Sequence, residues 1–327
     1  MTDCTLFSVS PAHPDANPLS YFPKPRARDF SALSSVLRLS TKYFIEHLRA
    51  QCLARLIHDW PITLADWDRR EAAATDASGR YTPRDAYAHP ILAINLALEL
   101  GIPEVLPSAF YDLARYAPSR ILSGTRALPP VFPAPDPCAA RGAKPMIHLS
   151  HDSFVRTLRG RELGQLYISS FLARALEHLP SVSCPYSARA AASGSGAAVA
   201  KLAHCTESFY FIHLNVLRSV GGIASGRDAD PLFALVQAVE MLERKDFSDG
   251  VRTCGLKMCG VCKREWKCEV GRAREEVWGL IPVWFGLRDG GAMDVSASAR
   301  STVQELQNGN GEETDVDVDI DVDELEE

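Results

Sequence analysis

The chain has 327 residues, a formal net charge of −6 and 46% hydrophobic residues, which is typical of a globular protein with one large domain or two smaller ones. Ten acidic residues lie in the last seventeen positions, "GEETDVDVDIDVDELEE", so the remainder carries 35 basic against 31 acidic side chains. A body so close to neutral gives no electrostatic case for binding nucleic acid or an anionic membrane.

Neither a membrane span nor a secretory signal is predicted. No apolar run reaches the roughly 18 residues that a transmembrane helix needs. The N-terminus has no basic segment followed by an apolar one. We therefore expect an intracellular protein, in the cytoplasm or the nucleus, whose nine cysteines are mostly thiols or metal ligands.

Apolar residues recur with helical spacing along most of the chain, and the sequence has no alternating strand pattern and no internal repeat. The stretches with this spacing are 30–60, 61–73, 91–101, 103–117, 154–179, 206–222, 228–247 and 264–286. Gly101 is typical of a helix C-terminus, Ser150 of an N-cap, and Asp230 with Pro231 of a helix start. The predicted fold class is therefore all-α, a multi-helix array.

Composition divides this array into parts. The expected parts are a poorly ordered N-terminus (1–30), a first helical part (31–125), a proline-rich loop (126–149), a second helical part (150–287) containing a low-complexity loop (185–201), and a disordered acidic tail (288–327). Within the first helical part, "WDRRE" at 67–71 is interpreted as a solvated charged face.

Four cysteines with the spacing C-x4-C-x2-C-x5-C, Cys254, Cys259, Cys262 and Cys268, form a candidate metal site. Cys259 and Cys262 make a C-x2-C knuckle, which commonly presents two ligands to tetrahedral zinc. A plant-type iron–sulfur loop also starts C-x4-C-x2-C, although this chain has no well-separated fourth cysteine after it. The remaining interpretation is that Cys259 and Cys262 are buried apolar residues and that Cys268 is a surface thiol.

Helix geometry restricts which thiols can bind one ion. In a helix that begins near residue 262, Cys262 shares the apolar face of Trp266 and Val270, whereas Cys268 lies about 200° away from Trp266. The predicted ligands of a zinc site are therefore Cys254, Cys259 and Cys262, with a fourth from elsewhere in the chain. The candidates for that fourth ligand are His204, Cys205 and Cys184.

A second candidate site is "IHLSHDSF", which contains His148, His151 and Asp152. An enzyme active site there is the alternative to a plain helix start, in which Asp152 favours the N-terminal dipole and the histidines are solvated. We expect the helix start, because no glutamate or third histidine is placed to complete a site. No catalytic residue and no cofactor is predicted, and a structural zinc ion at the cysteines is the alternative to that expectation.

Several longer phrases resemble a known family. The stretch "YFPKPRARDFSALSSVLRLSTKYFIEHLRAQCLARL" resembles the C-terminal helices of a BTB/POZ domain. The matching positions are Leu39, Lys42, Tyr43, Leu48, Cys52 and Leu56. The phrases "HPILAINLALELGIPEVLPSAFYDLARYAPSRI", "LRGRELGQ", "SFYFIHLNVLRSVGGIASGRDADPLF" and "CGLKMCGVCK…AREEVWGLIPVWFGL" look like the helical extension of BTB-domain proteins from mushroom-forming fungi.

The resemblance implies an interaction protein. In that family a strand-containing first half supplies much of the dimer interface and part of the surface used by cullin-type ubiquitin ligases. We expect the stretch before residue 30 to be too short to contain this half. We therefore expect a non-enzymatic protein–protein interaction module or scaffold, and a degenerate ubiquitin-ligase adaptor is one form that this role could take. A cullin-type ligase or a homo-oligomer is implied as partner where the first half is present. The alternatives are a zinc-stabilised, transcription-associated binding protein and an uncharacterised enzyme.

Overall fold

The computed structural model describes residues 27–128, 145–177, 180–187, 196–220, 230–245, 247–248 and 253–288. These residues belong to one compact unit, 1–289, and a second unit, 290–327, lies outside the described residues. The expectations for the N-terminus before residue 27, for most of the proline-rich loop and for the acidic tail therefore fall outside the described part of the chain.

The described fold is almost entirely helical, so the predicted fold class is confirmed. The helices are α1 Phe30–Lys42, α2 Glu46–Asp59, α3 Leu64–Ala73, α4 Pro83–Ala86, α5 Pro90–Leu100, α6 Leu106–Ala114, α7 Pro118–Ser123, α8 His151–Glu177, α10 Gly196–Val220, α11 Pro231–Glu240 and α12 Gly260–Trp284, with 3-10 turns η1 Ala27–Asp29 and η2 Pro103–Val105. Two short antiparallel ribbons join β1 Thr125–Arg126 to β2 Met146–Ile147, and β3 Phe247–Ser248 to β4 Thr253–Cys254. In the described residues, these ribbons and one isolated bridge are all the strand pairing there is.

Local sequence explains most helix ends. Gly101 takes a left-handed φ of 64° after α5, which a glycine adopts without steric cost. The Ser150 hydroxyl accepts a hydrogen bond from the Ser153 amide at 3.2 Å, and Asp230 accepts one from the Phe233 amide at 3.1 Å. These three signals are confirmed. One boundary is corrected: α10 begins at Gly196, so residues 196–201 of the predicted low-complexity loop are helical.

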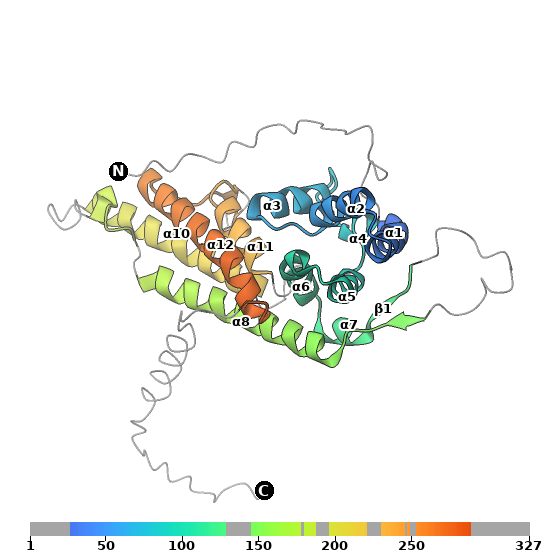
Figure 1. Ribbon diagram of the computed structural model, residues 1–327. Helices are drawn as coiled ribbons and strands as arrows, with labels where there is room; N and C mark the ends of the chain where they lie inside the picture. The colour runs from blue at the N-terminus through green and yellow to red at the C-terminus, as the bar shows by residue number, and fades with distance from the viewer. Residues whose placement is uncertain are drawn as a thin grey trace, which may run out of the picture. The chain divides into compact units, whose positions relative to one another are not determined.

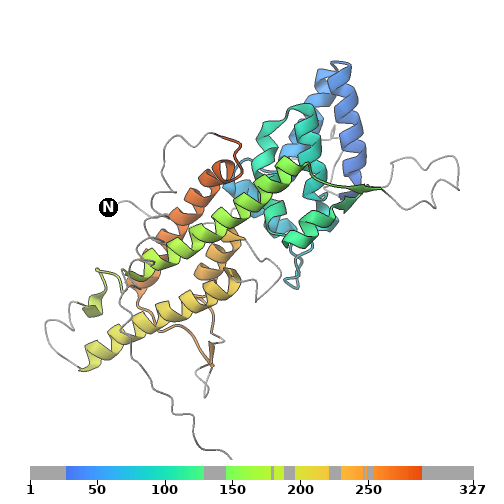
Figure 2. The ribbon, with the colours of Figure 1, turned by 90° about the horizontal axis from the view of Figure 1, so that it is seen from below.

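The long helix α8 connects two groups of helices. It contacts α6 and α7 along one part of its length and α10, α11 and α12 along another, as Figures 1 and 2 show. Gly160 and Gly164 of α8 permit this packing, because a Cβ at Gly160 would overlap the Phe285 ring and one at Gly164 would lie 3.1 Å from Pro231 Cγ. The missing side chains thus let the end of α12 and the start of α11 approach α8 closely.

A set of largely buried charged side chains links α3, α4 and α6 to the start of α11 through salt bridges. We call it the ion network, and its members are Arg70, Glu71, Arg84, Asp112, Arg115 and Asp230. Asp112 Oδ2 accepts from Arg70 at 2.8 Å and from Arg84 at 2.6 Å, and Asp112 Oδ1 accepts from Arg115. Arg115 also donates to Asp230 at 2.9 Å. Three arginines and three carboxylates therefore balance in charge.

The interpretation of "WDRRE" as a solvated face is wrong for three of its residues. Trp67 and Arg70 are each only 2% exposed, and Glu71 is largely covered. The Arg70 guanidinium lies 4.9 Å from the Trp60 ring and 4.4 Å from the Tyr87 ring, and its Nε donates to the Asp59 carbonyl at 2.8 Å. Burial is tolerated because every charge finds a partner inside the fold.

Candidate metal centre

Four cysteine side chains converge at the start of α12, and we call them the thiol cluster: Cys184, Cys205, Cys259 and Cys262. Their Sγ atoms all lie within 4.8 Å of one another, and the Sγ atoms of Cys184 and Cys259 are 3.9 Å apart. A tetrahedral zinc ion with Zn–S bonds of about 2.3 Å holds its sulfurs about 3.8 Å apart. The thiol cluster is therefore close to the geometry that a single zinc ion requires.

Three structural elements bring these thiols together. Cys205 lies within α10, on the buried stripe that also carries Phe209, Ile212 and Val216. Cys262 is in the first turn of α12 and Cys259 is its N-cap. Cys184 lies in the turn after α8, where its amide donates to the Ser181 carbonyl at 2.9 Å. The cluster thus joins α10, α12 and this turn at one point.

Backbone amides point at the sulfurs. The Cys262 amide donates to Cys259 Sγ at 3.4 Å, the Cys259 amide donates to Cys205 Sγ at 3.4 Å, and the Ser181 backbone hydrogen-bonds Cys262. An N–H group that donates to sulfur stabilises the thiolate over the thiol. The N-terminal end of α12 adds the positive end of its dipole. The surroundings therefore favour anionic sulfur, which is the form that binds metal.

Burial acts in the opposite direction on the protonation of these groups. It raises the pKa of the Cys262 thiol well above its ordinary value and raises the pKa of Cys205 to about 11. At Cys259 burial also opposes the thiolate, but hydrogen bonds from Cys262 and from the other two thiols bring the pKa below its ordinary value. Four adjacent thiolates need a cation between them, so metal binding here would displace protons.

The structure brings together two of the three predicted ligands and two of the three candidates for the fourth. Cys259 and Cys262 meet both Cys184 and Cys205, so the described thiols complete a set of four. His204 is instead 3.7 Å from Glu207 and partly exposed. Cys254 lies in β4, and its side chain is outside the described residues.

The structure also tests two expectations about the residues that follow Cys259. Helix α12 begins at Gly260, and its buried residues Cys262, Trp266 and Val270 share one face as predicted. Cys268 is disulfide-bonded and not a surface thiol, so that interpretation is wrong. The sequence predicted one distant ligand, and the structure supplies two. The sequence feature that pointed to Cys205 is its position on the apolar face of its helix.

The donor set limits the chemistry of the site. Four thiolates fill all four positions of a tetrahedral ion and leave no open position for water or substrate. The short sulfur separations suit one ion, whereas an iron–sulfur cluster interposes several irons between its thiolates. The arrangement can therefore hold a structural zinc ion and offers no catalytic metal position.

The second predicted candidate site lies at the surface. His148, His151 and Asp152 are all exposed, and Asp152 forms an ion pair with Arg156 at 2.7 Å. Asp152 lies in the first turn of α8, as the helix-start interpretation predicts. The His148 ring is 3.3 Å from the Leu122 carbonyl, which places it against α7.

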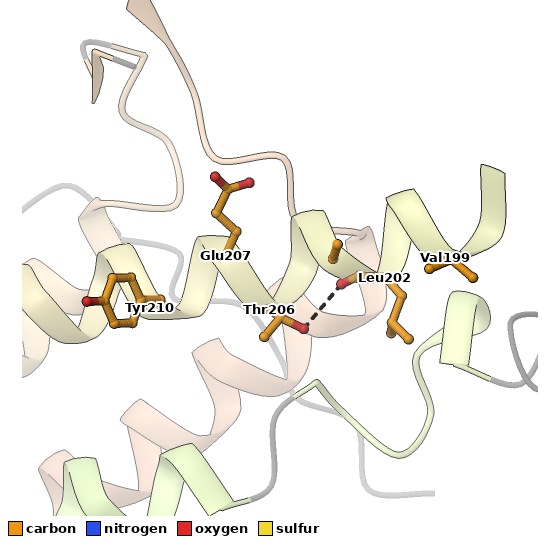
Figure 3. A pocket seen from close by; sticks show the side chains of 6 residues that line it. Val199, Leu202, Thr206, Glu207 and Tyr210 are labelled. Atoms are coloured by element: carbon orange, nitrogen blue, oxygen red, sulfur yellow. Dashed lines mark hydrogen bonds between the residues drawn. The ribbon is translucent and has the colours of Figure 1, made fainter. Parts of the chain in front are cut away.

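One side of α10 exposes apolar side chains at the surface. Figure 3 shows Val199, Leu202, Thr206 and Tyr210 along this side, with Glu207 beside them. Val199 is 50% exposed and Tyr210 is 58% exposed, and Leu214 continues the row at 38%. The row lies on a different side of the helix from Cys205, so α10 has one face on the core and another on the surface.

No protein-family model, curated protein or solved structure matches the chain. The likeness to BTB/POZ proteins therefore stays a prediction from the sequence phrases. In the described residues, no helix is both long enough and apolar enough to cross a bilayer.

Proposed function

We propose that the chain is a non-enzymatic helical scaffold for protein–protein interaction, stabilised by one structural zinc ion bound to the thiol cluster. The observation that carries this proposal is the convergence of four thiols from three separate elements within 4.8 Å. A closed set of four sulfur ligands belongs with a structural role, because a catalytic zinc keeps a position for water.

Two further observations support an interaction role. The exposed apolar row on α10 is of the kind that marks contact surfaces on soluble proteins. The resemblance to BTB/POZ proteins points in the same direction and implies a cullin-type ubiquitin ligase or a second copy of the chain as partner. In the cell the protein would then act by holding other proteins, in the cytoplasm or the nucleus.

The zinc ion is tested by metal analysis of the full chain purified under reducing conditions without added zinc. We expect about one zinc per chain, since a structural site is normally filled. Cys205→Ser and Cys259→Ser should both lose most of the metal. Cys52→Ser is the matched control, because Cys52 is a buried free thiol in α2, away from the cluster.

Cys254→Ser distinguishes the thiol cluster from the ligand set predicted from sequence. We expect this variant to keep its zinc, because the four described thiols already complete the tetrahedral set. Zinc below about 0.2 per chain in the unmodified protein would contradict the proposal, since structural sites bind tightly. Loss of zinc from Cys254→Ser with retention in Cys205→Ser would contradict the assigned ligands.

The interaction role has a separate test. The protein would be tagged at its C-terminus at its own locus, purified, and analysed by mass spectrometry. Recovery of a cullin, together with peptides from upstream of Met1, would support the ligase-adaptor form of the role. Recovery of the chain alone, as a monomer, would contradict it.

A further inference from the structure

The thiol cluster has unequal members. Cys184, Cys205 and Cys262 are each at most 1% exposed, whereas Cys259 is only partly buried. A small oxidant arriving from solvent therefore meets the Cys259 sulfur first.

The Cys184 Sγ atom lies 3.9 Å from the Cys259 Sγ atom. A disulfide needs an S–S distance of about 2.05 Å, so the two sulfurs must approach by a little under 2 Å. The cluster thus places one accessible thiol beside a second thiol at nearly the distance that disulfide formation requires.

Backbone conformation separates this pair from the other two thiols. Cys259 precedes α12 with extended angles, φ −69° and ψ 158°, and Cys184 lies in a turn closed by hydrogen bonds at Ser181 and Ser187. Cys205 and Cys262, in contrast, are inside α10 and α12, where the helical hydrogen bonds fix the backbone. Cys184 and Cys259 can therefore adjust without unwinding a helix.

We propose that the zinc centre is sensitive to peroxide: oxidation of Cys259 and its condensation with Cys184 form a disulfide that releases the zinc ion. This inference rests on the proposed structural zinc and names how that same site would be regulated. Because the thiol cluster joins α10 and α12, zinc release would loosen the contact between those helices.

The chemistry balances with hydrogen peroxide as the oxidant. The Cys259 thiolate attacks one peroxide oxygen, the O–O bond breaks, and the products are a sulfenic acid and, after one proton is taken up, water. The Cys184 thiolate then attacks the sulfenic sulfur, the S–S bond forms, and the S–O bond breaks to give a second water with a second proton. Two sulfurs lose two electrons in total, zinc stays divalent, and it leaves because two of its four ligands are consumed.

The test treats the zinc-loaded full chain with hydrogen peroxide and follows two signals together. A chromogenic zinc indicator measures released metal, and peptide mapping by mass spectrometry identifies the cross-linked cysteines. We expect one zinc released per Cys184–Cys259 disulfide formed, with recovery of zinc binding after addition of a thiol reductant and zinc. Cys52→Ser should release zinc at the same rate as the unmodified protein.

Three outcomes would overturn the inference. They are zinc that stays bound while peroxide oxidises other residues, zinc release with a Cys259–Cys262 disulfide, and zinc release with only sulfinic or sulfonic acids. Failure of the underlying zinc proposal is distinguishable, because it appears before peroxide is added, as a purified protein without zinc.

Discussion

The ion network and the thiol cluster solve the same physical problem in different ways. Both hold separate helices together through buried polar groups, which are costly unless they are compensated. In the ion network, three guanidiniums face three carboxylates, so the protein supplies both signs of charge. The thiol cluster has four ligands of one kind, so its compensation has to come from a bound cation.

Protonation shows the same contrast. Burial by itself would raise the pKa of Asp112, but the neighbouring guanidiniums of Arg84, Arg70 and Arg115 hold it well below its usual range. Burial raises the pKa of Cys205 to about 11, and the hydrogen bond from the Cys259 amide opposes this rise only in part. The side chains of the ion network compensate one another's charges. The thiolates of the thiol cluster are compensated only when a metal ion replaces their protons.

Removing zinc should have the largest effect, and it should be local. Structural zinc sites in small peptides contribute roughly 10–16 kcal/mol of apparent binding free energy, so chelation should destabilise the contact between α10 and α12 more than any single substitution. Hydrogen exchange with and without a strong chelator would measure this. We expect faster exchange in α10 and at the start of α12, with little change in α6. An equal increase in the exchange rate in both regions would contradict the idea that the thiol cluster and the ion network stabilise the fold independently.

Breaking the ion network should be the next largest effect. Asp112→Ala leaves buried guanidiniums short of a carboxylate, and we expect it to lower the free energy of unfolding by about 3–5 kcal/mol. Urea denaturation measures the loss. Asp152→Ala is the matched control, because Asp152 is also paired with an arginine but its side chain is 73% exposed. The control should cost less than about 1 kcal/mol.

Zinc content sharpens the result for Asp112→Ala. The variant should still bind about one zinc per chain, because the thiol cluster does not depend on the ion network for its ligands. Loss of zinc together with stability would mean that the two regions are coupled.

A smaller effect is expected at the edge of the ion network, from His89. Burial, helped by Arg84, lowers the pKa of this N-cap histidine to about 4. An unfolded chain titrates near 6.5, so it binds the proton more readily than the folded protein does between these values. The stabilisation is therefore complete above about pH 6.5 and is lost as the pH falls toward 4, by at most about 3 kcal/mol.

His89→Asn provides the comparison for this prediction. Asparagine retains the capping function but does not titrate. Near pH 7, the free energy of unfolding should depend on pH in the same way for the two proteins. On acidification to pH 4.5, the unmodified protein should lose more stability than His89→Asn. Parallel pH profiles would show that His89 does not titrate as described.

The sequence by itself determined the features that depend on neighbouring residues. Helical periodicity gave the all-α class, and the capping residues Ser150 and Asp230 and the glycine at Gly101 gave three helix ends. The inward face of α12, with Cys262 and Trp266, followed from 3.6-residue spacing. These predictions succeed because residues a few positions apart determine the hydrogen bonds within one helix and the face to which each side chain belongs.

Only the tertiary structure decided what these faces meet. Arg70 and Glu71 have the local pattern of a solvated face. They are covered because Asp112 of α6 and Arg115, the residue that caps its C-terminus, lie against them. Cys184 and Cys205 become candidate ligands only because they lie next to Cys259. Along the chain, Cys259 is 75 residues away from Cys184 and 54 away from Cys205. Local spacing carries no information about such distant partners, because the packing of several helices together sets which charges and thiols meet.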